Sequence, residues 1–109
     1  MAQEPQEPQE PKGPKEPKGY VILTEAIRDP EGMKAYGRAA GPAMGGATIL
    51  AVDTAPEVIE GTWHGDQTVV LEFESVDAAR AWYESEAYQK AAKLRQAAAD
   101  CNAVIIAGI

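Results

Sequence analysis

Three segments of this sequence are apolar at nearly every position instead of at every second one: residues 20–23, 68–71 and 103–106. A strand with one face in water alternates apolar and polar side chains, so these segments predict strands that are covered on both faces. One helix layer covers one face of a sheet, and the chain has no residues left for a second layer. We therefore expect two copies to pack sheet against sheet as a homodimer. The alternative is a contact of the second face with a sheet edge or a membrane.

The remaining pattern predicts an α+β chain of βαββαβ order, the ferredoxin-like plan with an antiparallel sheet. Asp29 and Pro30 are typical of a helix start, and Ser75 and Ser85 each precede a further helical stretch, the last one extending to about Ala99. Residues 48–52 and 58–63 are taken together as one interrupted or hairpin element. The predicted strands are residues 20–27, 48–52, 58–63, 67–74 and 103–109.

Residues 1–19 differ in composition from residues 20–109, which form the predicted ferredoxin-like domain. They contain five of the eight prolines, and from Pro5 to Pro17 these prolines recur every third residue, with Glu, Gln, Lys and one Gly between them. Polyproline II has three residues per turn, so all five prolines would lie on one ridge. This Pro/Glu/Lys-rich tail is either a ligand for a proline-recognising domain or a solvated spacer.

Charge and composition exclude several classes of function. The net charge is −7, and no cluster of basic and aromatic residues occurs, so nucleic acid is not an expected partner. A single cysteine and a single histidine exclude an intrachain disulfide and a site with several such metal ligands. No apolar run approaches the roughly 18 residues of a membrane span. We expect a cytoplasmic protein with no membrane contact, metal or cofactor.

The segment 71–99 has Glu72, Phe73, Ala79, Trp82, Tyr83, Ser85, Tyr88, Gln89, Leu94 and Arg95 in a characteristic order. Upstream of it, an Asp-Pro-Glu, a Gly-Gly pair and a Pro-Glu-Val follow one another in order. In these motifs, residues 20–109 resemble the small bacterial proteins grouped as domain of unknown function 1330 (DUF1330). The resemblance implies a dimeric α+β barrel, in a superfamily that also holds cofactor-independent monooxygenases, isomerases and haem-binding proteins, and it implies no activity. Members often carry an arginine soon after the Gly-Gly pair, and this chain has none there.

Glu72, Arg95 and Tyr36 are the candidate catalytic residues. Glu72 lies between two residues that should face the helices, so its carboxylate should face the dimer partner, where burial would suit a general base. The alternative is a structural Glu72 paired with Arg95 or with the other chain. Arg95 lies on an alanine-rich helix face, where it could hold a substrate carboxylate or Glu72. Tyr36 could donate a hydrogen bond to a ligand oxygen.

His64, Tyr83 and Tyr88 are the candidate ligand-binding residues. His64 is the only histidine and could act as a base or bind haem, or it could be an exposed turn residue. The two tyrosines could contact a ligand through their hydroxyl groups, or they could be core residues whose hydroxyl groups reach water.

Three functions follow, in order of preference. The first is binding of a small apolar or aromatic molecule in a cleft between sheet and helices, with acid–base chemistry that needs no cofactor. The second is a non-catalytic dimeric assembly protein that presents the proline-rich tail. The third is a haem enzyme.

Overall fold

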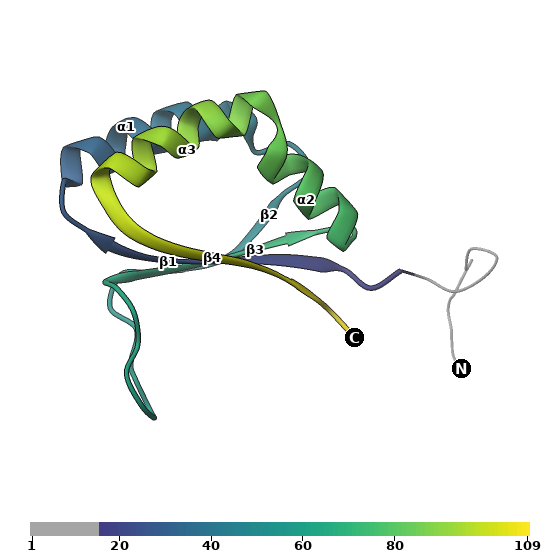
Figure 1. Ribbon diagram of the computed structural model, residues 1–109. Coiled ribbons are helices and arrows are strands. Elements are labelled where there is room, and N and C mark those ends of the chain that lie inside the picture. Colours follow the sequence, from purple (N-terminus) through teal and green to yellow (C-terminus); the bar gives the residue numbers. More distant parts are fainter. Residues whose placement is uncertain (1–15) are drawn as a thin grey trace, which may run out of the picture.

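The computed structural model describes residues 16–109 and contains one sheet with helices on one face (Figure 1). The predicted tail lies almost entirely outside the described residues. The chain follows the expected βαββαβ order, with a short 3-10 helix after the first helix, and its second helical part consists of two helices, as the two serines predicted. The elements are β1 (Gly19–Ile27), α1 (Pro30–Ala40), η2 (Gly41–Ala43), β2 (Thr48–Asp53), β3 (Gln67–Phe73), α2 (Val76–Glu84), α3 (Glu86–Ala98) and β4 (Ala99–Ala107).

The sheet has the strand order β2-β3-β1-β4, and each neighbouring pair is antiparallel. The first strand therefore lies inside the sheet, and β2 and β4 form its edges. This arrangement confirms the α+β, ferredoxin-like class. No helix within residues 16–109 is long and apolar enough to span a membrane.

The predicted capping residues begin the three α-helices. An oxygen of the Asp29 side chain accepts a hydrogen bond of 3.1 Å from the Gly32 amide, and Pro30 is the first residue of α1. At the start of α2, the Ser75 hydroxyl accepts a hydrogen bond of 3.0 Å from the Ala78 amide. At the start of α3, the Ser85 hydroxyl accepts a hydrogen bond of 3.2 Å from the Tyr88 amide. Side-chain caps of this kind satisfy amides that have no partner inside the helix.

The two faces of the sheet have different environments. Val21 and Leu23 of β1 point toward the helices and are 2% exposed. Leu71 is paired with Val21 in the sheet register and is buried on the same side. On the opposite face, which we call the open face, Val104 and Ile106 of β4 are 51% and 45% exposed. The single chain thus leaves apolar residues of the open face in contact with solvent.

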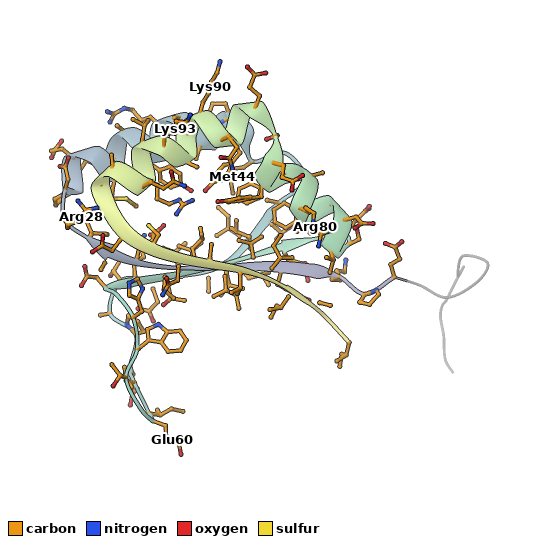
Figure 2. The ribbon with its side chains drawn as sticks, viewed as in Figure 1. Arg28, Met44, Glu60, Arg80, Lys90 and Lys93 are labelled. Atoms are coloured by element: carbon orange, nitrogen blue, oxygen red, sulfur yellow. The ribbon has the colours of Figure 1, made fainter. Side chains whose placement is uncertain are left out.

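The prediction of a strand at residues 58–63 is wrong. Residues 54–66 leave the sheet after β2 and form a loop, here called the arm, that extends away from the helices (Figure 1). Glu60 lies at its tip (Figure 2). A strand needs a hydrogen-bonded neighbour, and β2 pairs directly with β3. Gly61 also has a positive φ of 76°, which interrupts an extended backbone.

The base of the arm is fixed to the sheet by hydrogen bonds. The Asp66 amide donates a hydrogen bond of 2.8 Å to the Glu25 carbonyl. The Ile27 amide donates a hydrogen bond of 3.0 Å to the Asp66 carboxylate. The indole nitrogen of Trp63 donates a hydrogen bond of 2.8 Å to the Thr68 hydroxyl. These contacts position the backbone of β1 at the point where the candidate site begins.

A smaller difference concerns the last strand. It begins at Ala99 instead of the predicted residue 103, immediately after α3 ends at Ala98. Ala99–Ala107 pairs along the whole length of β1, so hydrogen bonding to β1 extends the strand toward its N-terminus.

Candidate functional site

The buried charged residues between the helices and the sheet are Glu25 and Arg95, which are 1% and 2% exposed. Charged side chains are seldom buried so completely unless they have a specific role or partner. Glu25 comes from β1, and its neighbours in the sheet register are Gln67 of β3 and Cys101 of β4. Arg95 comes from the inward face of α3. The site is built around these two side chains.

Glu25 is positioned by the alternation of β1. Val21, Leu23 and Glu25 project to the same side of the strand, so the carboxylate enters the layer between sheet and helices. One carboxylate oxygen accepts a hydrogen bond of 2.6 Å from the Gln67 side-chain amide. Sequence reasoning missed Glu25, although its parity with the two buried apolar residues was a usable signal.

Two tyrosines connect the helices above this carboxylate. The hydroxyl groups of Tyr36 on α1 and Tyr88 on α3 share a hydrogen bond of 2.8 Å. The Arg95 guanidinium carbon lies 5.8 Å from the Tyr36 ring centroid, within the range of a cation–π contact. Ala91, Ala92 and the rest of the alanine-rich face let α3 pack closely enough to enclose Arg95. Glu25, Tyr36, Gln67, Tyr88 and Arg95 are called the polar cluster below.

A cavity of about 280 Å³ adjoins the polar cluster. It lies between α1 and the helix-facing side of the sheet. Glu25, Tyr36 and Gln67 are its hydrogen-bonding side chains, and residues such as Met44 and Val69 form the apolar remainder of its wall. A largely apolar cavity with a few polar groups at one end is typical of a small-molecule site.

Burial, together with the hydrogen bond to Tyr88, raises the pKa of Tyr36 well above its ordinary value of 10.0. Burial acts in this direction because it disfavours the charged phenolate. Tyr36 therefore stays neutral at alkaline pH values at which an exposed tyrosine ionises.

We predict that Tyr36→Phe flattens the loss of stability at alkaline pH. Above pH 10 the unfolded chain ionises Tyr36 while the folded chain keeps it protonated, so this residue stabilises the fold below pH 10 and that stabilisation is lost as pH rises. The loss is about 1.4 kcal/mol of unfolding free energy per pH unit. Urea titrations across this range should show a shallower decline in the variant, whereas parallel curves for both proteins above pH 10 would contradict the assignment.

The structure separates two of the predicted catalytic residues. Glu72 lies on the open face, as its position between helix-facing residues predicted, and accepts a hydrogen bond of 3.0 Å from the Tyr20 hydroxyl. Arg95 lies between the sheet and the helices, so the suggested pairing of Arg95 with Glu72 is wrong. The sheet itself stands between the two side chains. The hydrogen bond to Glu72 raises the pKa of Tyr20.

The predicted ligand-binding residues also divide between the two faces. Tyr88 belongs to the polar cluster, and the Tyr83 ring lies 5.8 Å from the Tyr88 ring. His64 lies at the base of the arm, where its Nδ1 shares a hydrogen bond of 2.7 Å with the Thr24 hydroxyl. Thr24 alternates with Leu23 and Glu25 along β1, so this contact is on the open face, away from the polar cluster. Within residues 16–109 no group of three or more His, Cys, Asp or Glu side chains could hold a metal ion.

Solved structures share this fold at low sequence identity. A protein of unknown function from Rhodopseudomonas palustris, RPA0582, matches with a TM-score of 0.71 and 23% identity over 86% of this chain and 84% of its own. SnoaB, a cofactor-independent oxygenase from Streptomyces nogalater, matches with a TM-score of 0.57 and 12% identity over 83% of this chain and 91% of its own. These similarities establish the fold alone.

A third similar structure is described as dimeric. It is a ferredoxin-like protein of unknown function from Thermobifida fusca, with a TM-score of 0.56 and 16% identity over 91% of this chain and 98% of its own. No curated protein matches the chain in sequence. The family model described as domain of unknown function (DUF1330) matches residues 18–109, the whole of the sheet and its helices. The chain therefore belongs to the DUF1330 family.

Proposed function

We propose that this protein binds a small apolar or aromatic molecule in the cavity between α1 and the sheet. The observation that carries the proposal is the buried carboxylate of Glu25 in the wall of an otherwise apolar cavity. An apolar cavity of about 150 Å³ can hold one benzene. At about 280 Å³, this cavity suits a molecule of one or two rings that bears a hydroxyl or carbonyl group.

The polar end of the cavity supports acid–base chemistry without a cofactor. The Glu25 carboxylate would accept a proton from a bound phenol or enol, and the Tyr36 hydroxyl would donate a hydrogen bond to the ligand oxygen. Arg95 lies behind the Tyr36 ring, where its positive charge would stabilise negative charge that develops on that oxygen. In this proposal Glu25 takes the role that the sequence suggested for Glu72, and Tyr36 keeps its role. Arg95 would stabilise charge on the ligand oxygen instead of holding a substrate carboxylate or Glu72.

We also propose that the protein is a homodimer formed through the open face. The exposed apolar side chains of β4 support this interface, as does Ile59 on the arm, which is 88% exposed. The Thermobifida fusca protein of similar fold is described as dimeric. The single cysteine supports a reducing compartment, and we propose the cytoplasm.

The binding proposal predicts that Gly37→Leu blocks the cavity without unfolding the protein. Gly37 lines the cavity, and a Cβ at this position meets no atom within 4 Å, so a leucine fits there without a clash and adds its bulk to the wall of the cavity. Leucine also has a higher helix propensity than glycine, by up to about 1 kcal/mol. Isothermal titration with 2-naphthol should give saturable binding to the wild type and at least about tenfold weaker binding to the variant.

Two further variants test which carboxylate acts. Glu25→Gln should weaken 2-naphthol binding, because the amide no longer accepts the hydroxyl proton as a carboxylate does. Glu72→Gln, on the opposite face of the sheet, should bind as the wild type does. Equal binding by the wild type and Gly37→Leu would reject the cavity as the site, and a loss confined to Glu72→Gln would place the site on the open face.

A further inference from the structure

A second cavity, of about 510 Å³, lies on the α3 and β4 side of the polar cluster. Arg95, Tyr83 and Cys101 line it, and none of these three lines the cavity proposed for the aromatic ligand. Arg95 thus borders this second cavity while Glu25 borders the first. We call the second one the Arg95 cavity.

The charge of Arg95 lacks a close anionic partner in the part of the chain that the structure describes. None of the ion pairs among residues 16–109 includes Arg95, and its Nε has no hydrogen-bond partner there. Arg95 is nevertheless 2% exposed, so water solvates the guanidinium very little. A buried cation is costly unless it is paired and hydrogen-bonded. An anion bound beside it would satisfy both requirements.

The acidic residues near Arg95 are engaged by other partners, so neither occupies the place of an anion beside the guanidinium. Asp100 lines the same cavity, but its carboxylate forms an ion pair of 3.3 Å with Arg28 near the surface. The Glu25 carboxylate accepts its hydrogen bond from Gln67. Neither acid forms an ion pair with Arg95 among residues 16–109.

We propose that the Arg95 cavity binds a small molecule through a carboxylate group. A guanidinium offers two parallel N–H donors that match the two oxygens of a carboxylate. A single arginine suits a monoanion better than a doubly charged phosphate, particularly in a chain whose net charge is −7. The Tyr83 ring in the wall suits an aromatic body attached to the carboxylate. An arylcarboxylate is therefore the ligand class, and this inference stands independently of the first cavity.

The test is a titration of the full chain with benzoate and with benzamide, its neutral isostere, followed by amide shifts in ¹H–¹⁵N spectra. Benzoate should give saturable shifts at Tyr83, Cys101 and their neighbours, and benzamide should bind at least about tenfold more weakly. Saturable shifts of equal affinity for both compounds, or none for benzoate at millimolar concentration, would overturn the proposal.

Two variants separate charge from geometry. Arg95→Met should abolish benzoate binding, and Arg95→Lys should weaken it about tenfold, because lysine keeps the charge but cannot form the paired hydrogen bonds. If the methionine variant fails to fold, the lysine variant and the comparison of benzoate with benzamide still test whether Arg95 binds the carboxylate. Unchanged benzoate binding in a folded Arg95 variant would refute the assignment.

A last variant separates this proposal from the one for the first cavity. Gly37→Leu should leave benzoate binding unchanged while it blocks 2-naphthol. Failure of either ligand alone therefore identifies which of the two proposals is wrong.

Discussion

Val104→Asp should convert the protein from a dimer into a monomer at micromolar concentration. Val104 is paired with Ile22 on the open face and is 51% exposed in the single chain, so the proposed interface would bury it. A carboxylate buried in an apolar interface loses its hydration, and this desolvation costs several kcal/mol. In a twofold dimer the substitution occurs twice, so dimerisation should weaken by at least about a thousandfold. Sedimentation equilibrium measures this change directly.

The matched control is Leu94→Asp. Leu94 of α3 is also apolar and is 41% exposed, but it lies in the helix layer instead of on the open face. This variant should keep the mass and the dissociation constant of the wild type. Ile106→Asp, in the same strand as Val104, should behave like Val104→Asp. The homodimer proposal fails if the wild type is itself monomeric at these concentrations, or if the Val104 variant remains dimeric.

The order of the elements could be predicted because its signals are local. The Asp29, Ser75 and Ser85 caps each act within three residues, and the chain begins helices where they stand. The strands of the sheet are apolar and β-branched, so they form wherever a partner strand is available. These signals do not depend on the rest of the fold.

The arm could not be predicted because its state depends on distant partners. Residues 58–63 have strand-like composition, yet the chain leaves the sheet after β2, and the arm pairs with no strand among residues 16–109. A strand propensity without a neighbour to bond is not realised. For the same reason β4 begins earlier than its composition predicts, because β1 provides hydrogen-bonding partners for the residues from Ala99 onward.

The site was predicted in part, for reasons of geometry. Tyr36, Tyr88 and Arg95 lie on inward helix faces, and helical spacing placed them there correctly. The parity that turns Glu72 toward the open face also separates it from inward-facing Arg95, so their pairing could have been rejected from the sequence. The contact between Glu25 and Gln67 depends on the register of β1 against β3, which no local signal gives.

Gly65→Ala should destabilise the fold strongly by disturbing the strand that carries Glu25. Gly65 has a φ of 87°, and a Cβ at this position would lie 2.6 Å from the carbonyl carbon and oxygen of Glu25. An alanine therefore adds the backbone strain of a left-handed residue, about 1–2 kcal/mol, to a clash with backbone atoms. Relief requires the base of the arm to move, which breaks the hydrogen bond from the Asp66 amide to Glu25. We expect a loss of about 3 kcal/mol or more in urea denaturation.

Gly61→Ala is the control that isolates the clash. Gly61 also has a positive φ, of 76°, but a Cβ there meets no atom within 4 Å. This variant should lose about 1–2 kcal/mol, from backbone strain alone. Equal losses for the two variants would mean that the contact with β1 contributes nothing. A larger loss for Gly65→Ala, with weaker 2-naphthol binding by the folded fraction, would connect the base of the arm to the position of the Glu25 carboxylate in the cavity.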